Sequence, residues 1–259
     1  MAFIQIDDIR MHYRTEGDPN RPCVVLSNSL GTDLSMWDAQ ADALARDFYV
    51  LRYDTRGHGQ SERGNKPLTL DRLARDVVQL LDAMTISRAH FCGISMGGMT
   101  GQWLGIHQPQ RLNKLVVANT AARIGTQDGW SGRAAQVRAH GMDGVADGAA
   151  ARWFTPAFIE RATSTVDAMI AHLRAQDAEG YAACCDALAQ ADLRDAIAGI
   201  TVPTLIIAGA VDPVTTVADG AWMAQHIPGA KLDTVPASHL SNIEAAQQFN
   251  HTLLQFLSH

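Results

Sequence analysis

The stretch FCGISMGG, residues 91–98, decides the fold of this chain of 259 residues. An apolar run ends in Gly93-Ile94-Ser95-Met96-Gly97, which matches the pattern G-x-S-x-G, and a helical pattern follows over residues 96–107. A sharp turn between strand and helix holds its serine in strained backbone torsions, and flanking glycines let neighbouring backbone pass closely. We therefore predict that Ser95 is a nucleophile whose hydroxyl projects from this turn. The alternative interpretation is a glycine-rich turn in which Ser95 only caps the helix.

Asp212 and His239 complete the set that a serine nucleophile requires. A serine needs a base within hydrogen-bond reach, and the base needs a carboxylate that fixes its tautomer. Asp212 follows the apolar run LIIAGA, and His239 follows LDTV, ahead of a last helical pattern. The chain order, Ser95 then Asp212 then His239, is the one that accompanies this strand–turn–helix motif. Turn chemistry at Asp212 or an unpartnered loop histidine would explain each alone, but together they indicate a catalytic triad.

Short apolar runs alternate with helical patterns, which is typical of a mostly parallel sheet with crossover helices on both faces. Six runs are interpreted as buried strands: 23–27, 49–53, 90–93, 114–119, 204–210 and 231–235. Two opening segments, 3–6 and 10–14, alternate with the period of an antiparallel hairpin at the sheet edge, so eight strands are expected. Four helices are expected: 70–84, 96–107, 217–226 and 243–257.

The stretch from residue 122 to 200 interrupts this alternation. It is rich in Ala, Arg, Asp and Gly, carries several short helical patterns, and has no strand-like run. The strand pattern resumes with ITVPTLIIAGA, residues 200–210. We therefore expect an α/β core, residues 1–121 and 201–259, with a helical cap, residues 122–200, inserted between two strands of one sheet.

Composition and charge exclude several classes of function. Hydrophobic residues make up 47% of the chain, enough for a sizeable core, and the formal net charge is −6 without a run of like charges. A nucleic-acid partner is not expected, because phosphate contacts need a clustered basic face. No apolar stretch reaches the roughly 18–20 residues of a membrane span. The N-terminus lacks the pattern of a signal peptide.

The cysteines and histidines indicate neither disulfides nor a metal site. Cys23, Cys92, Cys184 and Cys185 show no C-x-x-C spacing, and two of them fall in apolar strand-like runs. We interpret them as reduced and structural, which favours a cytoplasmic location. The ten histidines do not cluster with Cys, Asp or Glu at ligand spacing, so no metal is expected.

On these residues, the sequence resembles the α/β-hydrolase superfamily over essentially its whole length. YDTRGHGQS, residues 53–61, is similar to the D-x-R-G-x-G-x-S turn of that superfamily. There Asp54, Arg56, Gly57 and Gly59 would shape a tight turn without a catalytic role, and the helical insertion is similar to the cap of many members. A narrower resemblance is to the 3-oxoadipate enol-lactonases. It is carried by SNSLGTDLSMW (27–37), YDTRGHGQS and GISMGGM (93–99), in this order.

This resemblance implies a carboxylic-ester hydrolase of the β-ketoadipate route of aromatic catabolism. Its substrate and expected partner would be a five-membered enol-lactone with an acetate side chain, opened through an acyl-enzyme on Ser95 without any cofactor. The oxyanion would lie between the backbone amides of Leu30 and Met96, with a side-chain role for Asn28 or Ser29 as the alternative. A monomer and a homo-oligomer both remain open.

The acetate carboxylate needs a cation, preferably an arginine, whose planar fork matches a carboxylate in two hydrogen bonds. Trp130 and Arg133 lie three residues apart, so they share a face of a helix and are the favoured lining of the pocket. Trp153 beside Arg152 is a second possibility. A solvated arginine and a core tryptophan are the simpler interpretation of each pair. Among the arginines of the cap, the candidates are Arg123, Arg133, Arg138 and Arg152.

Other functions on the same scaffold compete with the lactonase hypothesis. Carboxylesterases, carbon–carbon bond hydrolases and cofactor-free perhydrolases share the site and differ mainly in the cap, so the sequence separates them poorly. A dehalogenase is disfavoured, because that chemistry needs an aspartate where Ser95 stands. A ligand receptor that retains the triad is a further alternative, which slow turnover would distinguish.

Overall fold

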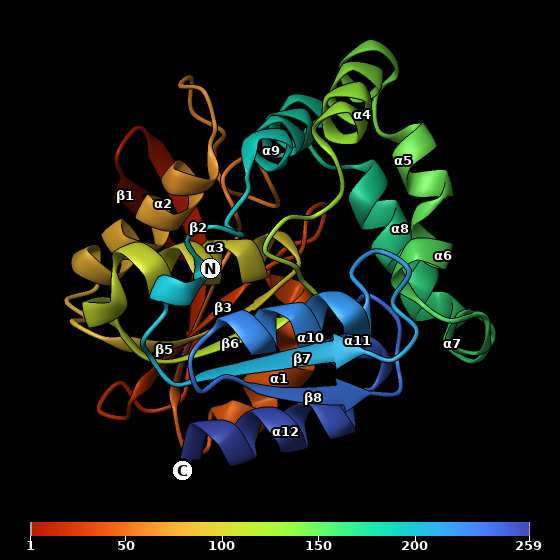
Figure 1. The fold of residues 1–259 in the computed structure, drawn as a ribbon. Coiled ribbons are helices and arrows are strands. Elements are labelled where there is room, and N and C mark those ends of the chain that lie inside the picture. Colours follow the sequence, from red (N-terminus) through yellow and green to blue (C-terminus); the bar gives the residue numbers. More distant parts are fainter. Residues whose placement is uncertain (1, 259) are drawn as a thin grey trace.

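A computed structural model describes residues 2–258 and shows one sheet with helices on both faces (Figure 1). Its eight strands lie in the order β1-β2-β4-β3-β5-β6-β7-β8. β2 is antiparallel to β1 and β4, whereas the six strands from β3 to β8 are parallel to one another. The predicted eight-stranded, mostly parallel sheet with an edge hairpin is therefore confirmed. The strands are β1 Ala2–Ile6, β2 Ile9–Glu16, β3 Cys23–Ser27, β4 Tyr49–Tyr53, β5 Ala89–Ile94, β6 Leu112–Ala118, β7 Thr204–Gly209 and β8 Lys231–Val235.

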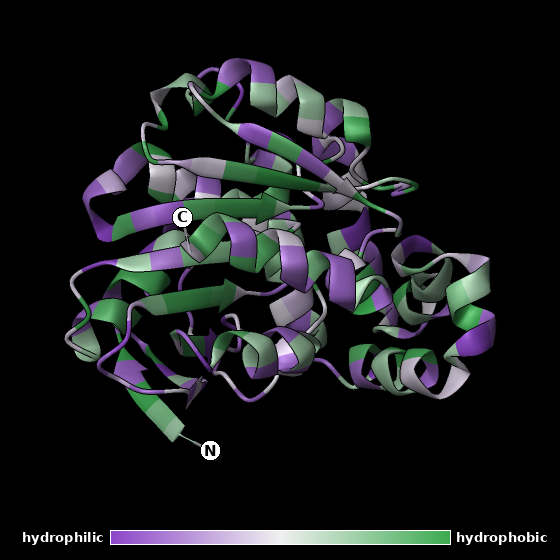
Figure 2. Cartoon of the chain, turned by 90° about the horizontal axis from the view of Figure 1, so that it is seen from below, coloured by the Kyte–Doolittle hydropathy of each residue, from purple (hydrophilic) through white to green (hydrophobic). Residues whose placement is uncertain are grey.

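Helices of the core cover the two faces in pairs. α1 (Asp38–Leu44) packs with α12 (Ala246–Ser258) on one face, and α2 (Leu70–Ala83) packs with α3 (Met96–His107) on the other. α10 (Val217–His226) lies along β7 and β8. The hydrophobic core is centred on the middle strands of the sheet. Every residue of β3 and β5 is buried, and the middle of the sheet is hydrophobic in Figure 2. Near-continuous apolar runs are what parallel strands covered on both faces require.

Local predictions fail at three places. The sequence predicts a buried strand at 231–235, but four of the five residues of β8 are exposed, because β8 is the outer strand and pairs only with β7. The predicted helix 243–257 is two helices, α11 (Ser241–Glu244) and α12, separated at Ala245, where φ is −122° and ψ is 45°. α1 and the preceding 3-10 turn η1 (Leu34–Trp37) are not predicted, because their apolar patterns are too short to stand out.

Between β6 and β7 the chain forms helices, which lie beside the carboxyl ends of the strands (Figure 1). Within residues 2–258 no strand falls in this segment, which we call the cap, residues 122–200. Its boundaries with the core stay a prediction. The helices are α4 Gln127–His140, α5 Asp143–Asp147, α6 Ala149–Trp153, α7 Pro156–Arg161, α8 Thr163–Arg174 and α9 Ala178–Gln190. Two further 3-10 turns are η2 Pro109–Arg111 and η3 Ile197–Gly199.

Residues 2–258 lack two features, a helix suited to a membrane and a cluster suited to a metal ion. None of their helices combines the length and the apolar character that crossing a bilayer requires. The same residues contain no group of three His, Cys, Asp or Glu side chains placed to hold a metal ion. All four cysteines are buried and free, as predicted.

Candidate active site

Ser95 stands at the turn between β5 and α3, as the motif predicts. Its backbone torsions are φ 56° and ψ −114°, which a residue with a side chain rarely adopts. The turn is tight: a Cβ atom built on Gly93 would lie 2.2 Å from the Gly97 carbonyl oxygen, and one built on Gly97 would lie 2.3 Å from the Ser27 carbonyl oxygen. The two glycines therefore allow the close backbone approach on which the strained serine depends.

Asp212 and His239 meet in a hydrogen bond of 2.8 Å between Oδ2 and Nδ1, and both side chains are buried. They come from the loops after β7 and β8, whose carboxyl ends share one edge of the sheet. Burial raises the pKa of Asp212. The hydrogen bond and charge of His239, together with hydrogen bonds from Asn119 and the Val214 amide, outweigh burial and leave the pKa below its ordinary value. The carboxylate is therefore ionised and fixes the orientation of the imidazole.

Asn119 lies beside the triad, and the sequence does not predict it as a site residue because it falls at the end of the predicted strand 114–119. It lies just past β6 with φ 43°, a conformation that asparagine tolerates better than most residues. Its Nδ2 donates hydrogen bonds to Asp212 Oδ2 at 3.0 Å and to the Ser238 carbonyl oxygen at 3.1 Å. Asn119 thus joins the loop of Asp212 to the loop of His239. An asparagine directly after a buried strand was the signal available in the sequence.

Ser95 and His239 line one cavity of about 390 Å³ between the sheet edge and the cap. Within residues 2–258, the structure has no hydrogen bond between the Ser95 hydroxyl and the His239 ring. Such contacts often tighten only when a substrate binds. The cavity therefore contains both a nucleophile and a base.

The amides of Leu30 and Met96 are free to donate. Met96 opens α3, where an amide has no partner inside the helix, and Leu30 lies in the loop after β3. In the part of the chain that the structure describes, neither amide forms a hydrogen bond. The Asn28 side chain is already committed, because Nδ2 donates to the Tyr53 carbonyl oxygen at 2.8 Å and Oδ1 accepts from Trp37 Nε1 at 3.0 Å. Backbone amides, rather than the Asn28 side chain, are therefore available for an anion.

Trp130, Arg133 and Trp153 all line the cavity that contains Ser95. The predicted shared face of Trp130 and Arg133 is observed on α4, where the Arg133 guanidinium carbon lies 4.9 Å from the centre of the Trp130 ring. The Trp130 indole is held by a hydrogen bond of 2.6 Å from Nε1 to the Ile124 carbonyl oxygen. An aromatic wall and a guanidinium therefore face the nucleophile from the cap.

The structure separates the four candidate arginines of the cap into two kinds. Arg123 pairs with Asp192 at 3.5 Å, and Arg138 pairs with Glu179 at 2.8 Å and Asp186 at 2.7 Å; neither arginine lines the cavity. Two arginines line the cavity and form no ion pair with any residue between 2 and 258: Arg133 and Arg152.

Arg133 and Arg152 influence each other and the wall of the cavity. Burial, and secondly the charge of Arg133, lower the pKa of Arg152. Burial raises the pKa of Tyr181 to about 12, an effect that the hydrogen bond and charge of Arg133 partly oppose. Two neighbouring guanidinium groups, whose geometry matches a carboxylate, therefore share this end of the cavity without an ion-pair partner in residues 2–258.

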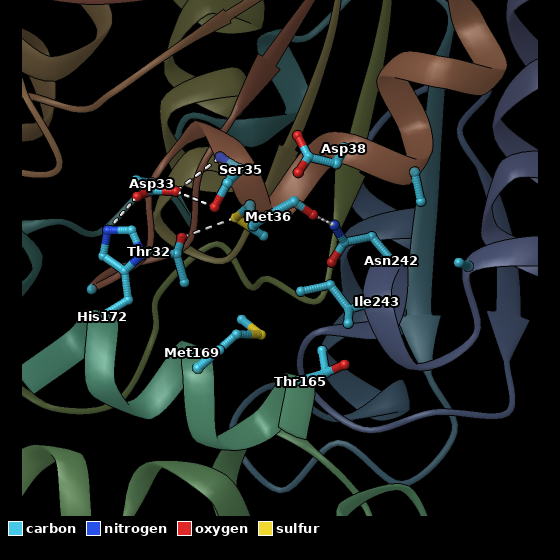
Figure 3. Close-up of a pocket in the computed structure, with 14 residues that line it drawn as sticks. Thr32, Asp33, Ser35, Met36, Asp38, Thr165, Met169, His172, Asn242 and Ile243 are labelled. Atoms are coloured by element: carbon cyan, nitrogen blue, oxygen red, sulfur yellow. Dashed lines mark hydrogen bonds and ion pairs between the residues drawn. The ribbon is translucent and has the colours of Figure 1, made fainter. Parts of the chain in front are cut away.

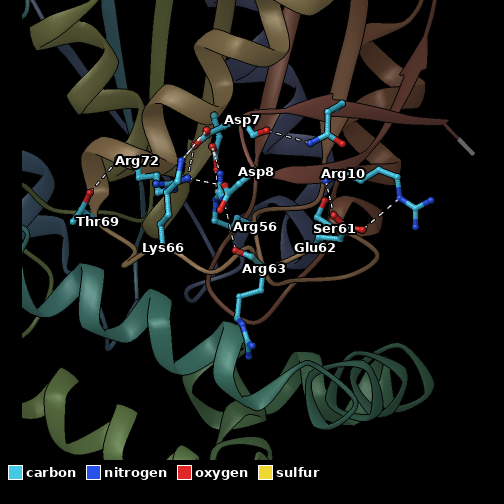
Figure 4. A network of polar contacts seen from close by, with 12 residues as sticks. Asp7, Asp8, Arg10, Arg56, Ser61, Glu62, Arg63, Lys66, Thr69 and Arg72 are labelled. Atoms are coloured by element: carbon cyan, nitrogen blue, oxygen red, sulfur yellow. Dashed lines mark hydrogen bonds and ion pairs between the residues drawn. The ribbon is translucent and has the colours of Figure 1, made fainter.

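The segment YDTRGHGQS shapes a turn, as the resemblance implies. Arg56 is buried and pairs with Asp8 at 2.7 Å and Asp76 at 2.6 Å, while Arg72 and Lys66 hold the neighbouring Asp7 (Figure 4). The Asp54 carboxylate accepts hydrogen bonds from the Leu34 amide and the Gln60 amide, each at 2.8 Å. Gly57 and Gly59 have φ of 73° and 54°. None of these residues lines the cavity of Ser95.

A second cavity of about 300 Å³ is lined by Thr32 and Asp33 from the loop after β3 and by Met169 and His172 from α8 (Figure 3). Leu30 lines the first cavity and Thr32 lines the second, so the same loop contributes to both. The Asp33 carboxylate and the His172 ring nitrogen Nε2 lie 2.6 Å apart at its wall. This pair joins the loop of Leu30 to α8 of the cap.

Known proteins match this chain over nearly all of its length. Residues 22–246 match the family described as the alpha/beta hydrolase fold. 3-Oxoadipate enol-lactonase 2 of Acinetobacter baylyi is 50% identical over 246 residues, which cover 95% of this chain and 92% of that protein. 3-Oxoadipate enol-lactonase 1 of the same organism is 48% identical, over 90% and 87% of the two chains. The crystal structure of the enol-lactonase from Burkholderia xenovorans has a TM-score of 0.98, at 45% identity over 100% of both chains.

Proposed function

The chain is an enzyme of the α/β-hydrolase family, and from this premise we propose that it opens the enol-lactone of 3-oxoadipate to give 3-oxoadipate. One observation carries the proposal: Ser95, His239 and the two unpaired arginines line the same cavity. A nucleophile at one place and a carboxylate receptor at another fit a small lactone with an acetate side chain. The 50% identity to a 3-oxoadipate enol-lactonase supports the same substrate.

In the acylation step, the Ser95 hydroxyl attacks the lactone carbonyl carbon while His239 Nε2 accepts its proton. Asp212 accepts the hydrogen bond from His239 Nδ1, which fixes the tautomer and stabilises the imidazolium that forms. The negative oxygen of the tetrahedral intermediate would lie between the amides of Leu30 and Met96. The amino end of α3 adds a partial positive charge at the same place.

Collapse of this intermediate breaks the bond between the carbonyl carbon and the ring oxygen. The leaving group is an enol oxygen, which takes the proton from His239 and stays attached to the acyl chain. Tautomerisation of the enol to a ketone makes the ring opening hard to reverse. Water, deprotonated by His239, then attacks the ester carbonyl of the acyl-enzyme and releases 3-oxoadipate with Ser95 restored.

The acetate carboxylate of the substrate would bind Arg133, with Arg152 as the second cation. Arg133 is held against the Trp130 ring at 4.9 Å, so its fork is already oriented before binding. Trp130 and Trp153 would contact the flat lactone ring. The proposal further assigns the reaction to the β-ketoadipate route of aromatic catabolism and to the cytoplasm, where four free, buried thiols are stable.

The test follows the loss of enol-lactone absorbance, in parallel with hydrolysis of p-nitrophenyl acetate. We expect a clear preference for the lactone. Ser95→Ala should lower kcat by at least about a thousandfold, whereas Ser87→Ala, at an exposed serine outside the cavity, should leave it unchanged. A preference for the neutral ester would refute the substrate and keep the serine hydrolase. Near-normal turnover by Ser95→Ala would refute the acyl-enzyme.

A further inference from the structure

Glu244 is a buried carboxylate that the proposed mechanism does not use. It ends α11, shortly after His239, and only 7% of it is exposed. Within residues 2–258, Glu244 forms no ion pair, and burying a carboxylate without a cation costs desolvation free energy. The other buried acids in this part of the chain each have a basic partner: Asp54 with His12, Asp76 with Arg56, and Asp212 with His239.

The two carboxylate oxygens of Glu244 bind two different segments. Oε2 accepts a hydrogen bond of 2.8 Å from the amide of Ser238, the residue before His239. Oε1 accepts a hydrogen bond from the hydroxyl of Thr155, whose amide lies 3.3 Å from both oxygens. Thr155 is in the cap, where its hydroxyl also caps α7. One carboxylate therefore connects the loop of His239 to the cap.

A second contact connects the same two segments on the other side of His239. The amide of Leu240 donates a hydrogen bond of 3.0 Å to the carbonyl oxygen of Trp153. Ser238 is thus fixed to the cap through Glu244, and Leu240 is fixed directly. Trp153 lines the cavity with Ser95, so the segment that holds His239 in place also carries a wall of the substrate site.

We infer that Glu244 is a positioning residue, which sets the His239 ring against Ser95 and sets Trp153 against the substrate. The inference rests on the proposed function. Glu244 does not line the cavity, so it acts only through the two segments that it joins. A base must lie within hydrogen-bond reach of the proton it accepts, and a shift of about 1 Å can cost about a hundredfold in rate.

Three substitutions separate the two links of this bridge. Glu244→Gln keeps the shape of the side chain but removes the charge and one acceptor oxygen. Its NH₂ group cannot accept from the amides of Ser238 and Thr155, and the Thr155 hydroxyl would have to accept from it instead of donating, so both links lose their charge-assisted hydrogen bonds. Thr155→Val removes the hydroxyl and leaves the Ser238 link. Thr155→Ser keeps the hydroxyl and serves as the conservative control. Arg63→Ala breaks an exposed ion pair of 3.5 Å with Asp177 of the cap and is the control for a contact between core and cap that is remote from His239.

The readout is kcat and KM per active site, with sites counted by complete titration with a fluorophosphonate. We expect Glu244→Gln to lower kcat about tenfold and Thr155→Val to raise KM for the lactone about fivefold, because the links orient the base and the cap wall respectively. The double variant should be no worse than Glu244→Gln within a factor of about two, since both changes break one bridge. Thr155→Ser and Arg63→Ala should match the wild type.

Several results would overturn the inference. A merely structural role would lower Tm and the titratable fraction while kcat and KM per titrated site stayed within a factor of about two. Losses that multiply in the double variant would show that the bridge is not shared. If Glu244→Gln does not fold, the contrast between Thr155→Val and Thr155→Ser decides. Wild-type protein that fails to hydrolyse the lactone refutes the proposed function instead, so the two failures are distinguishable.

Discussion

Replacing Arg133 by methionine should weaken binding of the acidic lactone without disturbing the chemistry at Ser95. Methionine keeps an unbranched apolar stem beside Trp130 and removes the charge. The structure leaves Arg133 without a carboxylate partner in residues 2–258, so the substitution breaks no ion pair that stabilises the fold. The substrate carboxylate does not change during the reaction, and its contact is equally strong in the ground state and the transition state. The loss should therefore appear in KM rather than in kcat.

The size of the effect follows from the kind of contact. A hydrogen bond to a charged group contributes about 1.5–3 kcal/mol, which corresponds to a loss of about 10- to 150-fold in kcat/KM. Arg152 lines the same cavity and remains as a second cation, which holds the loss toward the lower end. Removing both arginines should cost more than the product of the single effects, because each can partly replace the other.

The assay compares kcat/KM for the lactone with kcat/KM for p-nitrophenyl acetate, which carries no carboxylate. Arg133→Met should lower kcat/KM for the lactone and leave kcat/KM for p-nitrophenyl acetate unchanged. Arg138→Met is the matched control, because Arg138 is on the same helix, pairs with Glu179 and Asp186, and does not line the cavity. A change of less than about twofold for the lactone would refute Arg133 as the carboxylate receptor, given the contribution expected of a charged contact. Equal losses for both substrates would refute the specificity that we assign to it.

Three further outcomes are expected. The pKa of Asp212 is lowered in the folded state, so its contribution to stability is present above the unfolded pKa of about 3.9 and is lost as the pH falls through the lower folded value. In urea unfolding, Asp212→Asn should therefore lose less stability than the wild type as the pH falls. An equal loss of stability in both proteins would contradict the lowered pKa. Asn119→Ala should lower kcat/KM about tenfold, and it should lower the free energy of unfolding in urea by about 1–3 kcal/mol, because two buried acceptors lose their donor. Unchanged kinetics would exclude a role of Asn119 in the site. Gly97→Ala places a methyl group 2.3 Å from the Ser27 carbonyl oxygen and should destabilise the protein by more than about 3 kcal/mol in thermal unfolding, whereas a stable, active variant would disprove the tight turn.

Local patterns were sufficient where a residue's role depends on its neighbours in sequence. The turn at Ser95 can be predicted because strand, turn and helix are contiguous, and its strained torsions follow from that short segment. The contact between Asp212 and His239 can be predicted because each follows its own strand, and parallel strands bring their ends together. Trp130 and Arg133 share a face because helical spacing alone places them so.

Residues whose role depends on distant partners could not be predicted from local patterns. The sequence could not show which cap arginines are free, because that depends on where Asp192, Glu179 and Asp186 lie after folding. Burial of β8 was predicted wrongly, because its alternating and apolar residues do not reveal that it is the last strand. In the sequence, Glu244 cannot be distinguished from a solvent-exposed glutamate of a helix. Only its contacts with Ser238 and Thr155 in the folded protein distinguish it.

The cap contacts both halves of the reaction machinery, which ties substrate choice to catalytic geometry in this protein. The contact between Asp33 and His172 joins α8 to the loop that carries Leu30. The contacts of Glu244 and Leu240 join residues 153–155 to the loop of His239. A backbone shift in the cap that alters the pocket should therefore also displace the loop that carries Leu30 or the loop that carries His239. We expect cap variants selected for other esters to change kcat as well as KM. Substitutions that alter KM alone should be confined to side chains, such as Arg133, that contact neither the loop of Leu30 nor the loop of His239.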